Sequence, residues 1–214
     1  MAILRRVART ESALDTVRVG DMNDVASLVA SAAEAWHAEA GHIEPALARL
    51  ARDLKHEERR HVGLMPVGRE VPIPQVARDL GQALALLSQR LVLVLDPERR
   101  SVGVEAPGAG ALATEAAVLA PGVVALAPSR VAAPGAKFES LRALVRFADG
   151  EPEQWGLALL DLSGCTRPGE LLGAFDAIDV VVLVGKVGDT TDAALRRAAR
   201  ALPPEANLGV LLVD

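Results

Sequence analysis

The chain has 214 residues, half of them apolar, which suffices for one full core and a small additional element. Its formal charge of -5, its 2% aromatic content and its lack of tyrosine argue against nucleic-acid binding, which uses cations and stacking rings. The single cysteine excludes a disulfide framework, and no run approaches the roughly 18 apolar residues of a membrane span. We therefore expect a cytoplasmic globular protein with no integral membrane segment.

The first part of the chain, residues 1–58, is predicted to form an N-terminal arm and helices. Residues 1–20 are weakly periodic and are expected to be an arm, either mobile or docked on the remainder. Asp21 can cap a helix over 24–40, and a second amphipathic helix is expected over 43–60. Near residue 58 the apolar pattern changes, and we place the domain boundary there.

The second part, residues 59–214, alternates short apolar runs with amphipathic segments. Near-continuous apolar runs are typical of strands whose two faces are both buried. Strands are expected over 61–65, 91–96, 122–127, 156–161, 179–184 and 208–213. Helices are expected over 74–89, 110–119, 136–149, 169–176 and 190–202. The alternation predicts an α/β fold with a mostly parallel sheet and helices on both faces, plus the N-terminal helical extension.

The segment after the first of these strands, PVGREVPIPQ over 66–75, is where an open α/β sheet would bind phosphate groups. A phosphate-binding loop supplies backbone N–H groups, a lysine for the outer phosphates and a hydroxyl for magnesium. Here the lysine position falls near Ile73, and the two prolines have no N–H to donate. Gly68 and Arg69 are the only parts of such a loop that the segment retains, and Glu70 would repel an anion.

Acidic residues end two other predicted strands. Asp96 and Glu98 follow the strand over 91–96, and Asp161 ends the strand over 156–161. Carboxylates at such positions hold the water shell of magnesium in nucleotide sites, although each alone can also cap its own loop. The histidines lack the spacing and the accompanying carboxylates of a metal site, so we predict no metal site and no catalytic residue.

The ordered series from residue 61 to 214 resembles the ParA/MinD group of deviant-Walker P-loop ATPases, and most closely its bacterial tyrosine kinase branch in capsular polysaccharide assembly. Two stretches that carry the resemblance are GLMPVGREVPIPQVARDLGQALALLSQRLVLVLDPERRS and GLALLDLSG. The resemblance implies a P-loop NTPase-like fold. It places Asp96, Glu98 and Arg100 on the family's D-x-D-x-R motif, and Asp161 on the Walker B acid.

The chain departs from that family where the chemistry is done. The Walker A lysine and hydroxyl are missing, and no tyrosine is present for the kinases' C-terminal tyrosine cluster. Transition-state stabilisation in phosphoryl transfer comes mainly from the loop backbone, the lysine and magnesium. We therefore expect a vestigial nucleotide site, made of Gly68, Arg69, Asp96, Glu98 and Asp161, that binds no cofactor.

The resulting hypothesis is an inactive pseudo-ATPase, a scaffold or regulator in a bacterial envelope, polarity, motility or polysaccharide-export system. Its partners would be proteins, with a homodimer and a heteromer with an active relative both open, and recruitment to the membrane or pole would occur through them. One alternative is an ATPase or kinase with an unorthodox phosphate loop. Another makes the N-terminal helices the part that binds a partner.

Overall fold

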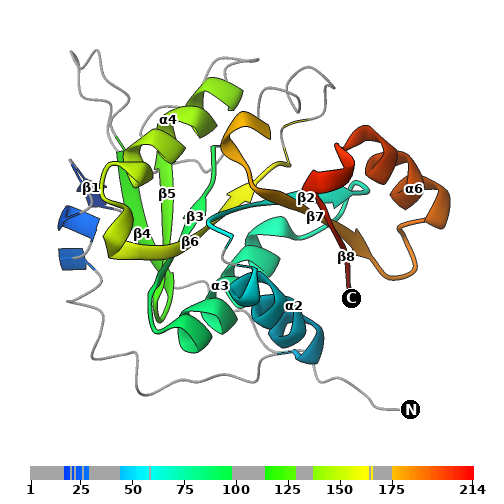
Figure 1. The fold of residues 1–214 in the computed structure, drawn as a ribbon, viewed down its shortest axis with the longest axis horizontal. Coiled ribbons are helices and arrows are strands. Elements are labelled where there is room, and N and C mark those ends of the chain that lie inside the picture. Colours follow the sequence, from blue (N-terminus) through cyan, green and yellow to red (C-terminus); the bar gives the residue numbers. More distant parts are fainter. Residues whose placement is uncertain are drawn as a thin grey trace.

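The computed structural model describes residues 17–19, 21, 23–25, 27–28, 44–57, 59–97, 114–128, 137–163, 165 and 175–214. Its strands are β1 (Val17–Val19), β2 (His61–Val67), β3 (Leu91–Leu95), β4 (Thr114–Ala120), β5 (Val123–Pro128), β6 (Trp155–Asp161), β7 (Val180–Lys186) and β8 (Asn207–Val213). They form one 8-stranded sheet in the order β1-β4-β5-β3-β6-β2-β7-β8 (Figure 1). Six neighbouring strands of that order run parallel: β5, β3, β6, β2, β7 and β8. At one end of the sheet, β4 pairs antiparallel with β5, and β1 pairs antiparallel with β4.

The six strands predicted from apolar runs are all confirmed, and no bound shifts by more than two residues. The reason is burial: all five residues of β3 are buried, and so are the first six of the seven in β7. Strands enclosed on both faces need apolar side chains at every position, which makes them visible in a sequence.

The helix predicted over 110–119 is wrong in the part that the structure describes, where β4 (Thr114–Ala120) is a strand. It pairs antiparallel with β5 across a turn formed by Pro121 and Gly122, and Gly122 has a φ of 73°. A Pro-Gly pair between two apolar runs is a hairpin signal. The alanine-rich composition favours a helix, but pairing with β5 overrides that local preference.

The helices with described bounds are α2 (Pro45–His56), α3 (Ile73–Ser88), α4 (Lys137–Asp149) and α6 (Asp192–Ala201). Helices α2 and α3 lie on one face of the sheet and α4 on the other, as Figure 1 shows, and α6 packs on β7 and β2. Both predicted layers are therefore present. None of the helices in the described ranges is long and apolar enough to span a membrane.

Other predicted N-terminal elements are seen only in part. The arm is in contact with the sheet at one point, because β1 (Val17–Val19) pairs with β4. Of the helix expected over 24–40, residues 23–25 and 27–28 are helical and the rest lies outside the described residues. The helix expected over 169–176 also lies mostly outside them, apart from the start of a 3-10 helix over Phe175–Ala177.

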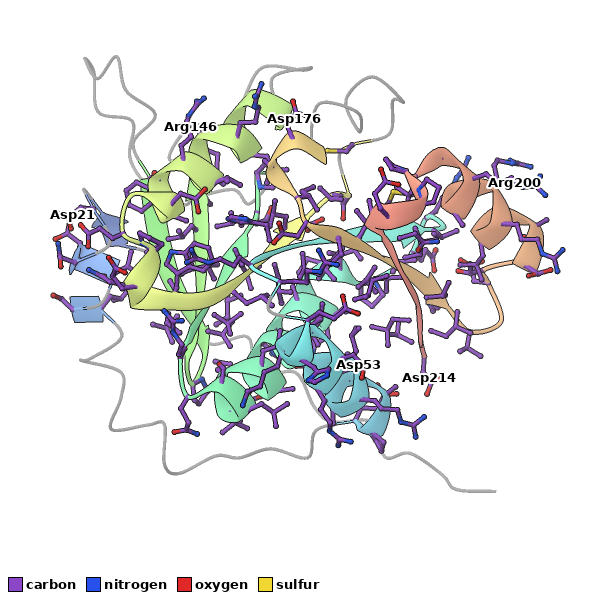
Figure 2. All side chains as sticks on the ribbon, viewed as in Figure 1. Asp21, Asp53, Arg146, Asp176, Arg200 and Asp214 are labelled. Carbon is purple, nitrogen blue, oxygen red and sulfur yellow. The ribbon has the colours of Figure 1, made fainter. Side chains whose placement is uncertain are left out.

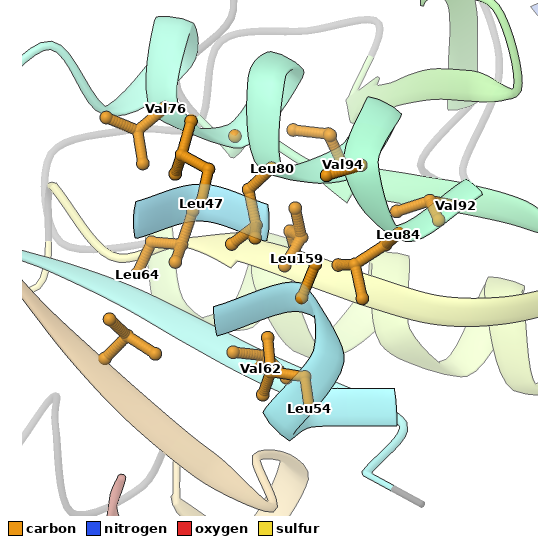
Figure 3. Close-up of a cluster of buried hydrophobic side chains, with 14 of the residues drawn as sticks. Leu47, Leu54, Val62, Leu64, Val76, Leu80, Leu84, Val92, Val94 and Leu159 are labelled. Atoms are coloured by element: carbon orange, nitrogen blue, oxygen red, sulfur yellow. The ribbon is translucent and has the colours of Figure 1, made fainter. Parts of the chain in front are cut away.

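The core between the sheet and helices α2 and α3 is built almost wholly from leucine, valine and alanine (Figure 3). Leu80 of α3 and Leu54 of α2 are both 0% exposed, and they lie in one cluster with Val62 of β2. Residues on both sides of position 58 thus share a core. The division into domains at that position stays a prediction.

Candidate functional site

The strand order brings the predicted site residues that the structure describes to the carboxyl ends of three neighbouring inner strands. Strand β6 lies between β2 and β3, although β3 follows β2 in the sequence. In open α/β sheets ligands bind outside the carboxyl ends of strands at such a crossover. Gly68 and Arg69 follow β2, Asp96 follows β3 and Asp161 ends β6. Glu98, which was predicted to belong to the site, lies outside the described residues.

Asp96 and Asp161 stand at matching backbone positions on neighbouring strands. Leu95 of β3 pairs with Leu160 of β6, so Asp96 and Asp161 are the next positions on neighbouring strands. Neighbouring strands are about 4.8 Å apart, and residues at matching positions share a face of the sheet. The register therefore places these two positions of the candidate site next to each other, and their role in a nucleotide site stays a prediction.

The surroundings of Asp161 keep its carboxylate in a fixed orientation. Only 7% of the residue is exposed. Its Oδ1 accepts a hydrogen bond from the backbone N–H of Ser163 at 2.8 Å and a second from the Ser163 hydroxyl. Asp161 pairs with Leu64, which is three residues before the end of β2, so the carboxylate lies about 10 Å back along the strand direction from the loop after β2.

The loop after β2, Gly68–Pro72, is the segment that would have to hold phosphates. Pro72 is the residue before α3 and Pro74 lies in its first turn, so neither offers an N–H group. The N–H of Ile73 donates to the carbonyl of Val71 at 2.9 Å. Helix N-termini bind anions through unpaired N–H groups. At this one, two of the donors are absent and a third is engaged.

Ile73 also occupies the position predicted for the phosphate-binding lysine. It is 0% exposed and belongs to the core between the sheet and helices α2 and α3. Its side chain points away from solvent into that core, where a charged group would carry a large desolvation cost. The residue at this position therefore serves packing.

A second loop, Val187–Thr191 between β7 and α6, holds the first one in place. The Thr190 hydroxyl donates to the carbonyl of Val67 at 2.7 Å and accepts from the N–H of Lys186 at 2.7 Å. A Cβ added to Gly68 would lie 3.4 Å from the Thr190 Oγ1, which shows how closely the two loops approach. We call this set of contacts the Thr190 latch.

Lys186 and Thr190 were not among the predicted site residues. They follow the strand predicted over 179–184, so their position at the same sheet edge was a usable signal. The Nζ of Lys186 lies 3.7 Å from the Glu70 carboxylate, whose side chain is 79% exposed. An ion pair this open to solvent contributes about 1 kcal/mol or less. Arg69 is exposed and has no ion-pair partner within the described ranges.

The arrangement fits a magnesium nucleotide only in part. The two carboxylates are where acids of such a site would stand, but the loop that should surround the phosphates presents prolines, an engaged N–H and a buried isoleucine. No cluster of three or more metal-ligating side chains occurs in the described part of the chain. This loop therefore has no lysine and offers fewer free N–H groups than a phosphate-binding loop supplies, and the absence of nucleotide binding stays a prediction.

A polar cavity of about 440 Å³ lies elsewhere, at the opposite ends of β2 and β7. Arg146 of α4 and Asp176 line it, and both are labelled along the upper side of Figure 2. Its other charged groups include Asp179, which accepts from the N–H groups of Arg60 and His61 at 2.8 and 2.9 Å. The cavity is thus separate from the strand ends that carry Asp96 and Asp161.

Comparison with solved structures places the fold among bacterial tyrosine kinase domains. The BceF tyrosine kinase domain matches with a TM-score of 0.56 and 15% identity over 78% of this chain and 75% of that one. The kinase domain of the Escherichia coli tyrosine kinase ETK gives 0.53 and 15% over 77% and 74%. The VpsO kinase domain gives 0.56 and 14% over 89% and 97%.

At identities this low, the structural similarity shows a shared fold alone. No protein-family model matches the chain. No curated protein sequence matches it either. The P-loop NTPase-like α/β fold expected from the sequence is confirmed by these structural neighbours.

Proposed function

We propose that the chain is a catalytically inactive pseudo-ATPase that acts as a protein-interaction scaffold or regulator in a bacterial cell-envelope, polarity, motility or polysaccharide-export system. The observation that carries the proposal is the loop between β2 and α3. Its two prolines have no N–H groups to donate, and the buried Ile73 occupies the position where a phosphate-binding lysine is expected.

The size of the missing interactions supports inactivity. A hydrogen bond to a charged group contributes roughly 1.5–3 kcal/mol. The loop lacks the lysine, and three of its N–H groups are absent or already bonded. These four missing interactions would together contribute roughly 6–12 kcal/mol to phosphate binding. Micromolar affinity corresponds to about 8 kcal/mol. The deficit is as large as the whole binding energy of an ordinary nucleotide site.

The kind of system is suggested by the structural neighbours, which are named as bacterial tyrosine kinase domains. A domain of this fold that lacks phosphate chemistry still presents loops and helices on which partners can bind. In this reading the protein works in the cytoplasm and reaches the membrane or pole through its partners.

The test is complementation in the native host. A strain lacking the chain is scored for surface polysaccharide, polarity and motility, and then receives either the wild type or the Asp161→Asn variant. The substitution removes the acid of the Walker B position but keeps its size and one oxygen for Ser163. A scaffold predicts full restoration by both chains. A variant that is shown to be folded by circular dichroism and yet fails to restore function would refute the proposal.

A second candidate, a nucleotide-binding ATPase or kinase with an unorthodox loop, is favoured by one observation. Arg69 is exposed without an ion-pair partner among the described residues, at the same sheet edge as Lys186. If these two cations replaced the missing lysine, Arg69→Ala and Lys186→Ala would each lower ATP affinity at least about tenfold. Equal, unmeasurable binding by the wild type and both variants excludes this candidate.

A further inference from the structure

Strand β8 (Asn207–Val213) forms one edge of the described sheet. Among the residues that the structure describes, it is the last strand in the sheet order and its one partner strand is β7. Two of its side chains remain in solvent, Val210 at 50% and Leu212 at 46% exposure, whereas Leu211 and Val213 between and after them are buried. Helix α6 packs on β7 and β2, and in Figure 2 it lies to one side of β8, with Arg200 projecting away from it.

This edge has few of the features that usually protect edge strands from pairing, since the irregularity of β8, a register shift at Leu208, lies before the residues Gly209–Val213. Proteins shorten such strands or place lysine, proline or another charged residue on them. The opposite edge, β1, is a strand of three residues. In contrast, β8 has seven residues, NLGVLLV, and contains no charge and no proline.

The backbone groups that face outward belong to the same two exposed residues. The carbonyl of Val213 accepts from the N–H of Val187 at 2.8 Å, so it points toward β7. Because the N–H and C=O of successive residues alternate in direction along a strand, Leu211 also points toward β7, whereas Val210 and Leu212 point to the open side. Each of these two residues thus offers one donor and one acceptor to an added strand.

From this arrangement we propose that β8 pairs antiparallel with β8 of a second copy of this chain, about a two-fold axis through Leu211. In that register Val210 faces Leu212 of the second copy and Leu212 faces its Val210. Both are hydrogen-bonded pairs, because all four residues turn their N–H and C=O groups toward the partner. The two pairs supply four hydrogen bonds. In each pair, the side chain of Val210 in one copy and that of Leu212 in the other cover each other.

The chemistry required of the added strand selects a second copy. It must be uncharged over about five residues and must carry two apolar side chains, two positions apart, on one face, and β8 itself meets both conditions. No like charges oppose each other in the pair. The charged Asp214 lies three positions from the axis, so it is about 20 Å along the strand direction from Asp214 of the second copy.

The pairing does not depend on the proposed function, because β8 contributes no residue to the site at the loop after β2. One strand pair buries less than the 1,200 Å² or so of stable complexes, so a weak dimer is expected. It should show a dissociation constant on the order of 10–100 μM, which sedimentation or light scattering can follow up to about 1 mM.

The experiment compares the wild-type chain with three variants by sedimentation equilibrium. Val210→Lys places a charge on the edge and should raise the dimer dissociation constant at least about tenfold. Leu87→Lys is the matched control, since Leu87 is also apolar and half exposed, at 40%, but lies on α3. It should leave the dissociation constant unchanged. The double variant V210K/L212E sets opposite charges across each predicted pair and should restore dimerisation.

A wild type that stays monomeric to about 1 mM would overturn the pairing, even if β8 binds a strand of another protein. A dimer that survives Val210→Lys, or one lost equally in Leu87→Lys, would overturn it as well. Failure of the double variant to recover dimerisation, with circular dichroism showing intact structure, would overturn the register through Leu211.

Discussion

The Thr190 latch gives a prediction whose size follows from its geometry. Thr190→Val keeps the shape of the side chain, including the carbon atoms that lie 3.0 and 3.1 Å from the position of a Cβ on Gly185. It removes both hydrogen bonds of the hydroxyl, at 2.7 Å each, and leaves the carbonyl of Val67 and the N–H of Lys186 without that partner. Each unsatisfied group costs about 1–3 kcal/mol when it is shielded from water.

Because Thr190 is only partly buried, water can replace some of the lost bonding, and we expect the free energy of unfolding to fall by about 2–4 kcal/mol. Urea denaturation measures it, with the fluorescence of the fully buried Trp155 as one probe and circular dichroism as the second. Thr190→Ser, which keeps the hydroxyl, should lose about 1 kcal/mol from the missing methyl group.

Thr191→Val provides the matched control at the next residue. The Thr191 side chain caps α6 by accepting from the N–H of Ala194 at 3.2 Å, and its loss should cost about 1 kcal/mol. If the stability of Thr190→Val stayed within about 0.5 kcal/mol of the wild type, the Thr190 latch would contribute nothing to holding the two loops together.

Three further substitutions test the packing and a strand end. Leu80→Ala leaves a cavity in the core shown in Figure 3 and should cost about 2–5 kcal/mol by urea denaturation, so a loss below 1 kcal/mol would contradict the described packing. Gly63→Ala would bring a Cβ within 2.6 Å of the Leu162 Cδ1 and should cost about 1–3 kcal/mol, whereas a gain in stability would show that the neighbours yield freely. Asp179→Ala removes the acceptor of two N–H groups at the start of β2 and should cost about 1–2 kcal/mol, with faster amide exchange at His61 as the specific readout.

Much of the fold could be predicted because the parallel strands are enclosed on both faces. Their continuous apolar runs identify them without any knowledge of their neighbours. Strand β4 was missed because its alanine-rich sequence is compatible with a helix, and only its pairing with β5 decides the outcome. The strand at Val17–Val19 is too short to leave a pattern.

The positions of the candidate site residues at strand ends could be predicted, whereas their function stays a prediction. Asp96 and Asp161 lie together because the register of β3 and β6 aligns them. Three features of the loops could not be read from the sequence: the bond from Ile73 to Val71, the Thr190 latch, and the approach of Lys186 to Glu70. These depend on how the loops fold against each other, and no local pattern encodes such contacts.

We propose that this chain does not bind nucleotide. Isothermal titration with ATP and with ADP, each with magnesium, measures this binding, and an active P-loop ATPase is titrated under the same conditions. We expect no saturable heat up to about 1 mM nucleotide, because the loop between β2 and α3 lacks interactions that would contribute roughly 6–12 kcal/mol. Saturable binding at micromolar concentration would show that the chain binds nucleotide and would refute the proposal.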